Sequence, residues 1–232
     1  MEMHEELKKR TGEVEAVIER YLPEEEGHQK TIFEAMNYSV RAGGKRLRPM
    51  LIEETYRLFG GTEEAVEPFM AAMEMIHTSS LIHDDLPCMD NDELRRGLPT
   101  TWKKFGYDMA VLAGDALMIY AFETAAKAFT MTAYPDRVAK SIKVLAEKTG
   151  IYGMIGGQVV DVELTGKPIP QDKLDFIYRL KTGALLEASM MIGAILGGAD
   201  EAAVKQVEQI ASAVGLAFQI QDDILDVTST SE

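Results

Sequence analysis

Helical periodicity runs through almost the whole chain, and strand-like alternation of apolar and polar positions is nearly absent. Residues 2–21 place Leu7, Val14 and Ile18 among charged residues, which predicts an amphipathic helix that ends near Pro23. Similar patterns predict further helices at 28–42, 50–59, 63–86, 108–131, 136–151, 171–196 and 200–227. With no low-complexity linker and no clear repeat, we expect one all-α domain over residues 1–232, a bundle of about eight to ten helices.

Composition supports a globular protein and excludes several classes of partner. The chain has 232 residues, 46% hydrophobic and 27% charged, which is enough for one substantial core. The formal charge of −14 argues against nucleic-acid binding and anionic membranes, although a local basic cluster can still hold a small anion. The single cysteine, Cys88, fits a reducing compartment. The N-terminus lacks a signal-peptide core and the best apolar run, residues 190–199, is too short to span a bilayer, so we expect a cytoplasmic protein without a membrane span.

The most unusual segment is residues 76–99, which carries five acidic residues within ten positions and then turns basic. The acidic residues are Asp84, Asp85, Asp90, Asp92 and Glu93, and the basic ones are Arg95 and Arg96. An apolar helical pattern leads up to the aspartate pair, and Pro87 breaks the helix directly after it. Alone, the segment would fit a charged helix end, so a second acidic group is needed to decide its role.

A second acidic group lies in residues 218–226, FQIQDDILD, on the last predicted helix. Asp222 and Asp226 are four residues apart and share one helix face, with Gln219 one turn before them. Like charges among apolar neighbours favour a compensating cation. Oxygen ligands without cysteine or a histidine pair indicate Mg²⁺, which binds few carboxylates together with water and phosphate oxygens. The two acidic groups therefore predict a polyphosphate substrate.

Basic residues at three places fit the same substrate. Lys45 and Arg48 lie beside a Gly-Gly turn, Arg95 and Arg96 follow the first acidic group, and Lys181 with Thr182 lies at a break in a helical pattern. Arginine and lysine are the expected ligands of phosphate oxygens, although each residue taken singly is more often a surface charge. The chain has neither a P-loop nor a strand-borne GxGxxG motif, so any phosphate is bound by another route.

The chain resembles the trans-isoprenyl diphosphate synthases, the family of farnesyl and geranylgeranyl diphosphate synthases. The resemblance rests on two aspartate-rich motifs, DDLPCMD at 84–90 and DDILD at 222–226, with GGKRLRP, LRRG, GQVVD and KTG in family order. It covers about residue 28 to the last residue given. It implies a bundle of long helices around a deep central cavity, with the two acidic motifs facing each other near the mouth.

The resemblance also implies a role for each motif residue. Direct ligands of three Mg²⁺ ions would be Asp84, Asp90 and Asp222, while Asp85, Asp223 and Asp226 would act through water. The allylic diphosphate would be bound by Arg95, Lys181, Thr182 and Gln219, and isopentenyl diphosphate by Lys45, Arg48, His77 and Arg96. Because His77 precedes Asp84 by two helical turns, both can lie on one helix face.

The implied reaction is head-to-tail chain elongation. Mg²⁺ and cationic side chains would stabilise the departing diphosphate of dimethylallyl, geranyl or farnesyl diphosphate. Isopentenyl diphosphate would attack the resulting carbocation, and the released diphosphate would accept the proton. The groups around Lys181 and Thr182 would steady the cation in a site that excludes water. The family also implies a homodimer.

Product length depends on residues before the first aspartate. Ser79 and Ser80 are small where a farnesyl-producing relative usually has an aromatic residue at position 79, and Met75 would close the channel one turn deeper. We therefore expect mainly geranylgeranyl diphosphate, C20. For the product, the alternative is farnesyl diphosphate (C15), and the two serines would then only pack the helix. For the function, the alternatives are a class I terpene cyclase and a non-catalytic subunit of a heteromeric prenyl synthase.

Two departures from the family pattern stand out. The chain stops at Glu232, where relatives usually continue with a lysine-bearing segment, so we expect that a C-terminal segment is missing from the domain. Trp102 stands where relatives of this subtype often carry histidine, and the sequence offers no physical reason for that exchange.

Overall fold

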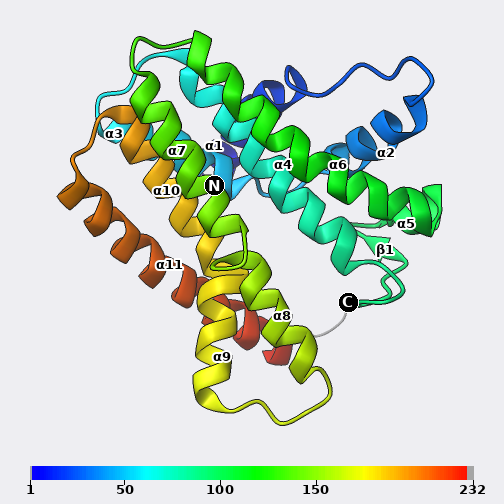
Figure 1. The fold of residues 1–232 in the computed structure, drawn as a ribbon. Helices are drawn as coiled ribbons and strands as arrows, with labels where there is room; N and C mark the ends of the chain where they lie inside the picture. The colour runs from blue at the N-terminus through cyan, green and yellow to red at the C-terminus, as the bar shows by residue number, and fades with distance from the viewer. Residues whose placement is uncertain (1, 229–232) are drawn as a thin grey trace. The chain divides into compact units, whose positions relative to one another are not determined.

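The computed structural model describes residues 2–228, except the side chains of residues 2, 222, 223 and 225–227. Within this range the chain forms eleven α-helices, short 3₁₀ and π-helical segments, and one two-stranded hairpin (Figure 1). The prediction of an all-α fold is confirmed. Contacts divide the chain into two compact units, Met1–Glu53 with Glu63–Val138 (unit 1) and Glu54–Thr62 with Ala139–Glu232 (unit 2).

Unit 1 is built around the buried helix α4. Its complete helices and helical turns are α1 (Glu2–Glu19), α2 (Lys30–Arg41), η1 (Glu64–Val66), α4 (Glu67–Asp84), α5 (Thr101–Phe105), α6 (Tyr107–Ala126) and η2 (Lys127–Thr130). Most of α3 (Leu47–Leu58) and the first residues of α7 (Pro135–Thr149) also belong to it. Helix α4 packs against α1, α2 and α6, and every residue from 68 to 76 is buried. Burying this apolar run supplies the core of the unit.

The packing of α4 on α6 depends on a glycine. A Cβ on Gly114 of α6 would lie 2.1 Å from Nε2 of His83 on α4. His83 Nε2 also lies 3.3 Å from the carbonyl oxygen of Val111 and 3.6 Å from the Asp115 carboxylate. The ring of His83 therefore occupies the space that a side chain at position 114 would need, which fixes the end of α4 against α6.

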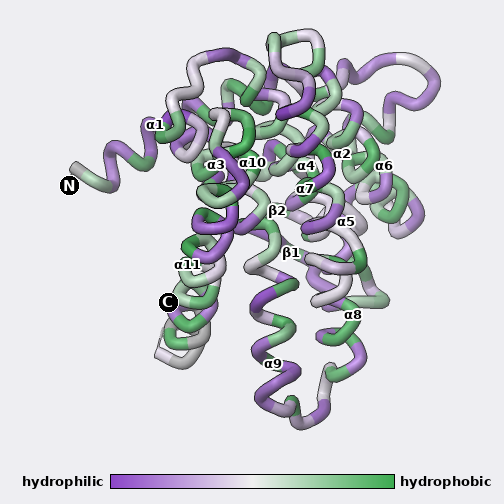
Figure 2. Tube along the Cα trace, turned by 60° about the vertical axis from the view of Figure 1, so that its left-hand side comes forward, coloured by the Kyte–Doolittle hydropathy of each residue, from purple (hydrophilic) through white to green (hydrophobic). Residues whose placement is uncertain are grey.

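Unit 2 holds the remaining helices. They are α8 (Met154–Leu164), α9 (Gln171–Ile177), the π-helical segment η3 (Tyr178–Gly183), α10 (Ala184–Gly197), α11 (Glu201–Thr228) and most of α7. Helix α10 packs on α11, and η3 packs on both α8 and α11. Figure 2 shows the contrast in hydropathy between the polar α9 and the apolar α10, which follows it in the chain after η3.

One ionic cluster connects three helices of unit 2. The ammonium group of Lys148 on α7 contacts Glu187 of α10 and lies 2.7 Å from Glu208 Oε1 of α11. Burial alone would lower the pKa of Lys148, but hydrogen bonds to the two carboxylates raise it above its usual range. The lysine therefore stays charged, as a half-buried cation with two acidic partners should.

Helix positions agree with the sequence pattern except at four places. The helix predicted at 63–86 begins as the 3₁₀ turn η1 before α4, and the one predicted at 171–196 contains the π-helical η3. Helices α5 and α8 were not predicted. Helix α8 has two adjacent glycines and exposes Ile155, Val159 and Val162, so its apolar positions do not form a single buried stripe.

Two stretches, Tyr107–Thr130 and Gln171–Gly197, are long and apolar enough to cross a membrane by length and composition alone. Core helices of soluble proteins pass the same test, and 39% and 67% of the respective windows are buried within the structure. The finding is weak evidence for a membrane span, and the expectation of none remains a prediction.

Gly157 of α8 tests the close contact between α8 and η3. A Cβ at this position would lie 2.4 Å from the backbone nitrogen of Lys181. We expect Gly157→Ala to lower the free energy of unfolding by about 1–3 kcal/mol, because the two backbones must separate. Chemical denaturation followed by circular dichroism measures this change.

Gly12→Ala is the matched control, since a Cβ there meets nothing within 4 Å. Alanine should leave stability unchanged or raise it by up to about 1 kcal/mol at this position in helix α1. Equal unfolding midpoints for Gly157→Ala and the unmodified protein would contradict the close approach of α8 and η3.

Candidate active site

The first aspartate motif folds back on the end of α4. Asp84 is the last residue of the helix, and the backbone N–H of Asp90 donates to the carbonyl oxygen of Asp84 at 2.9 Å. The backbone N–H of Met89 donates to the carbonyl oxygen of Leu86 at 2.8 Å, and Asn91 then takes a left-handed conformation with φ of 57°. This turn brings Asp84 and Asp90 to the same end of α4.

A tight hairpin follows the acidic loop. Strands β1 (Leu94–Arg95) and β2 (Leu98–Pro99) pair antiparallel through a two-residue turn. The turn residues Arg96 and Gly97 have φ of 54° and 78°, as a type I′ turn requires. The phenolic hydroxyl of Tyr38 on α2 donates to the carbonyl oxygen of Pro99 at 2.7 Å. The hairpin is therefore tied to α2 and carries an arginine at its turn.

The base of the hairpin is fixed at one carbonyl oxygen. The backbone carbonyl of Asp92 accepts hydrogen bonds from Thr100 Oγ1 and from Trp102 Nε1, both at 2.8 Å. Trp102 thus has a physical role that the sequence did not reveal. The ring N–H that it donates is a group that histidine also has.

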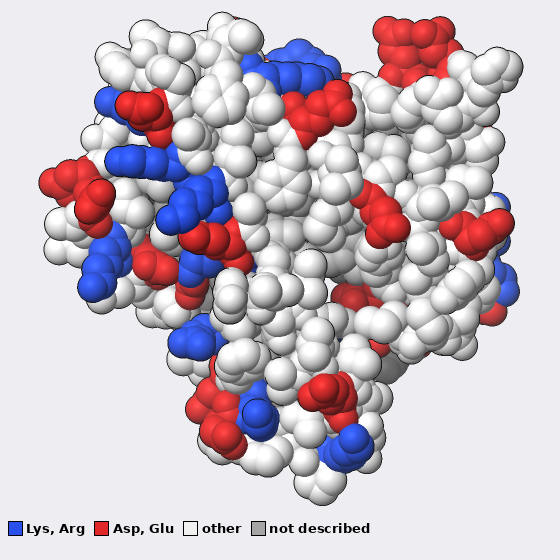
Figure 3. All heavy atoms as spheres, in the orientation of Figure 1, with Lys and Arg blue, Asp and Glu red and all other residues white. Residues whose placement is uncertain are grey.

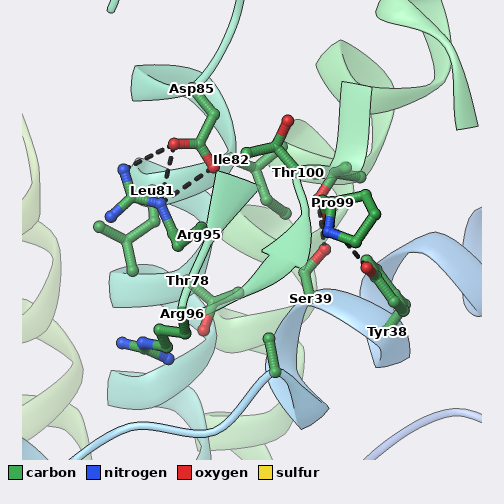
Figure 4. Close-up of a pocket in the computed structure, with 12 residues that line it drawn as sticks. Tyr38, Ser39, Thr78, Leu81, Ile82, Asp85, Arg95, Arg96, Pro99 and Thr100 are labelled. Carbon is green, nitrogen blue, oxygen red and sulfur yellow. Dashed lines mark hydrogen bonds and ion pairs between the residues drawn. The ribbon is translucent and has the colours of Figure 1, made fainter. Parts of the chain in front are cut away.

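Arg95 is held by the second aspartate of the motif. Its Nε lies 2.8 and 3.0 Å from the two carboxylate oxygens of Asp85, and its Nη2 lies 2.6 Å from Oδ1 (Figure 4). Asp85 is 3% exposed, and burial raises its pKa although Arg95 opposes that rise. Asp85 therefore orients Arg95, and its predicted contact with Mg²⁺ through water stays a prediction. The pair lines a small pocket between the hairpin, α2 and α4.

Three predicted phosphate ligands lie together in unit 1. Arg48 Nη1 is 3.2 Å from Nε2 of His77. The guanidinium of Arg96 lies against Gly44, where a Cβ would be 2.8 Å from Nη1 and where φ is 141°. Burial lowers the pKa of Arg48, Arg96 and His77, and neighbouring arginines add to this effect, whereas the carboxylate of Glu74 opposes it. Lys45 is exposed and follows Gly44 in the chain.

One buried donor of this cluster has no partner. Arg48 Nε is buried and has no hydrogen-bond partner among the residues that the structure describes. Unpartnered buried donors are rare in folded proteins, and cations that repel one another are stabilised by a bound anion. The cluster therefore has the charge and free donors of a phosphate site.

Behind the cluster lies an ion pair that sequence reasoning missed. Arg46 Nη1 is 2.7 Å from Glu74 Oε1, both side chains are 3% exposed, and Arg46 Nη2 donates to the carbonyl oxygen of Val40 at 2.7 Å. Burial would raise the pKa of Glu74, but His77 and Arg46 together lower it to about 2. Glu74 is the single acidic residue in the apolar run at 69–76, and an acid in such a run could have indicated a buried ion pair from the sequence alone.

In unit 2, the predicted residues lie on η3 and α11. Lys181 Nζ is 2.6 Å from Asp161 Oδ2 of α8, and Thr182 follows it within the π-helical segment. Such segments are often found at functional sites. Gln219 of α11 is half-buried. The side chains of Asp222, Asp223 and Asp226 lie outside the described residues, and the roles assigned to them remain predictions.

Within the described side chains, no group of three or more His, Cys, Asp or Glu is arranged to hold a metal ion. Asp84 and Asp90 supply two carboxylates at one end of α4. Mg²⁺ typically binds one or two carboxylates together with water and substrate phosphates, so this donor set fits it. The loop could hold Mg²⁺ with a diphosphate as the further ligand.

The residues predicted to set product length are buried in α4. Ser79 and Met75 are fully buried, and the hydroxyl groups of Ser79 and Ser80 donate to the carbonyl oxygens of Ile76 and His77 at 2.8 and 2.9 Å. Both hydroxyl groups are therefore satisfied within the helix. Neither the C20 prediction nor simple helix packing is decided by these contacts.

Comparisons with known proteins point in one direction. The family model described as Polyprenyl synthetase matches residues 29–232. The chain is 52% identical over 202 residues to a chloroplastic geranylgeranyl pyrophosphate synthase of Catharanthus roseus, covering 87% of this chain and 56% of the relative. It is 46% identical over 219 residues to a farnesyl diphosphate synthase of Geobacillus stearothermophilus, covering 94% and 73%.

A solved structure agrees with these relatives. The apo structure of an FPP/GFPP synthase from Zymomonas mobilis matches with a TM-score of 0.90 at 37% identity, over 99% of this chain and 83% of that chain. The chain spans slightly more than half, 56%, of the length of the Catharanthus relative.

Trp102 offers a test of the hairpin anchor. We expect Trp102→Phe to remove the bond to the Asp92 carbonyl, to lower the free energy of unfolding by about 1 kcal/mol, and to increase proteolytic cleavage within residues 92–101. Limited proteolysis with mass spectrometry measures the cleavage. Trp102→His keeps a ring N–H and should be cleaved more slowly than Trp102→Phe; equal cleavage of both variants would argue against the anchor.

Proposed function

Because the chain belongs to the polyprenyl synthetase family, we propose that it is a Mg²⁺-dependent trans-prenyltransferase that joins an allylic diphosphate to isopentenyl diphosphate head to tail. The observation that carries this proposal is the cluster of Arg48 and Arg96 with His77, in which the buried Arg48 Nε has no hydrogen-bond partner among the described residues. His77 lies two turns before the acidic end of α4 on the same helix.

The proposed roles follow the motifs. Isopentenyl diphosphate is bound by Lys45, Arg48, His77 and Arg96. The allylic diphosphate is bound by Arg95, Lys181, Thr182 and Gln219, and three Mg²⁺ ions are held by Asp84, Asp90 and Asp222. Asp85 positions Arg95 and Asp161 positions Lys181, since each aspartate forms an ion pair with its basic residue.

In the proposed mechanism, Arg95 and Lys181 bind the oxygens of the allylic diphosphate, and bound Mg²⁺ supplies further positive charge to the leaving group. The C1–O bond breaks and its electron pair stays on the diphosphate. The double bond of isopentenyl diphosphate then supplies the pair for the new C–C bond. Loss of a proton to the released diphosphate restores a double bond, and no side-chain nucleophile is required.

For the product we propose geranylgeranyl diphosphate, C20. The relatives include a geranylgeranyl synthase at 52% and a farnesyl synthase at 46% identity, so identity alone does not choose between C20 and C15. The small, fully buried Ser79 favours the longer product, with Met75 as the floor one turn deeper.

Purified protein incubated with Mg²⁺, isopentenyl diphosphate and a C5, C10 or C15 starter tests the proposed reaction. We expect elongated product that depends on isopentenyl diphosphate, and a rate reduced about 100-fold or more in Asp84→Asn. A product formed without isopentenyl diphosphate would indicate a terpene cyclase. No product from any starter would favour the non-catalytic subunit.

Ser79→Tyr tests the length gauge. The phenol ring would fill the channel above Met75, so we expect the main product to shift from C20 to C15, measured by chromatography. Ser79→Ala removes the hydroxyl without adding bulk and should leave the C20 product unchanged. An unchanged product length in Ser79→Tyr would show that this serine only packs the helix.

We also propose a homodimer that uses helix α6. Leu112 and Ile119 of α6 are 54% and 70% exposed and lie two turns apart on one face. Helix α6 also carries the exposed acids Asp108, Asp115 and Glu123, and Figure 3 shows acidic side chains standing apart from one another among uncharged ones on this face of the molecule. A second copy of the chain would bury this apolar face.

Light scattering should give twice the chain mass for the unmodified protein and a lower mass for Ile119→Glu. Leu58→Glu is the control, because Leu58 is 78% exposed and is not on α6. Equal masses for both variants would argue against the α6 interface.

A further inference from the structure

We propose that Glu74 is the positioning residue of the isopentenyl diphosphate site: it faces the protonated Nδ1 of His77 and stabilises the imidazolium that forms when the diphosphate binds. Binding of the substrate would then take up a proton. This inference rests on the proposed function, which places the diphosphate beside Arg48 and His77.

Glu74 lies between a buried arginine and the histidine. Its Oε1 is 2.7 Å from Arg46 Nη1 and 3.5 Å from Nδ1 of His77. Because Glu74 precedes His77 by three residues on α4, both side chains project from one helix face. Arg46 also contacts the Val40 carbonyl and, at 3.4 Å, Glu15, so Glu74 is not its single acceptor.

The contact with Arg48 determines where the proton on His77 lies. A guanidinium group can only donate, so Nε2 of His77, 3.2 Å from Arg48 Nη1, must be the acceptor. The proton of the neutral ring is then on Nδ1, which faces Glu74 Oε1 at 3.5 Å and has no hydrogen-bond partner among the described residues. A doubly protonated ring would place an N–H group against the guanidinium N–H. The geometry therefore fits neutral His77 in the Nδ1–H tautomer.

The charged groups that face His77 are Glu74 on its own helix, Arg48 on α3 and Arg96 on the hairpin turn. Burial and Arg48 lower the pKa of His77, and Glu74 opposes them. A diphosphate beside Arg48 would take up the donors of that arginine, including the buried Nε that now lacks a partner. Nε2 of His77 would then bind a proton from solvent and donate it to a phosphate oxygen, with Glu74 facing the other ring nitrogen.

Calorimetric titration with isopentenyl diphosphate tests this coupling. Titrations at pH 8 without Mg²⁺, in two buffers of different ionisation enthalpy, give the number of protons taken up. We expect the unmodified protein to take up roughly one proton more per ligand than His77→Gln. The double variant Arg46→Met with Glu74→Gln, which removes both buried charges, should lose most of this uptake and bind about tenfold or more weakly.

A second measurement does not depend on the folding of any variant. Nitrogen NMR of the unmodified protein reports the tautomer of His77, and we expect the Nδ1–H form without ligand. The Nε2–H form would overturn the proposal, as would proton uptake and affinity in the double variant equal to those of the unmodified protein.

Failure of the underlying function gives a different result. If the unmodified protein neither binds isopentenyl diphosphate nor elongates any starter, the proposed function is wrong and this inference falls with it. If it binds and elongates but takes up no more protons than His77→Gln, only the role of Glu74 is wrong.

Discussion

The buried ion pair between Arg46 and Glu74 is the interaction on which the cluster proposed to bind a phosphate depends. Arg46 has a left-handed backbone with φ of 51°, after two glycines that also have positive φ. Its guanidinium is tied to α4 through Glu74 and to α2 through Val40. Lys45 and Arg48 flank Arg46 in the chain, so fixing this arginine in the core fixes where the two outer cations can lie. A buried carboxylate and guanidinium would each be strongly destabilising without the other.

A second constraint operates at the other end of α4. There the chain leaves a buried helix and presents aspartates to solvent. Local hydrogen bonds, and not a hydrophobic core, hold this segment in place. The Asp90 N–H closes the loop on Asp84, and the Asp92 carbonyl holds the base of the hairpin. Asp85 turns inward to Arg95. One of the two adjacent aspartates is thereby used for structure, whereas Asp84 and Asp90 are the carboxylates proposed to bind a metal ion.

Periodicity predicted most helices because apolar residues at helical spacing must be buried, and that requirement holds whatever the tertiary arrangement. It failed for α8, whose Gly157 serves a close backbone contact at Lys181 and whose apolar residues are partly exposed. It also could not reveal that the break at 178–183 is a π-helix, because that geometry depends on packing against α8 and α11.

The same limit applies to the site. The motif GGKRLRP offers two arginines, and the sequence assigned a role to Arg48 without showing that Arg46 points into the core. The positive φ of Arg46 turns its side chain inward. Arginine has no preference for positive φ, so the sequence around Arg46 does not indicate this conformation. Glu74 was missed for a related reason: its partners lie 28 residues earlier and three residues later, and the distant one depends on the fold.

Helix α4 separates two tasks by its own geometry. In an α-helix of 3.6 residues per turn, Glu74, His77 and Asp84 fall within about 80° of one another, whereas Met75 and Ser79 fall on the opposite side. The first face carries the groups that bind charge, and the second carries the small and flexible side chains that would limit the length of an apolar product. Because residues on opposite faces do not share neighbours, a change of volume at Ser79 need not disturb His77 or its partner Glu74. The length of the product and the binding of the diphosphate can therefore vary independently on one helix.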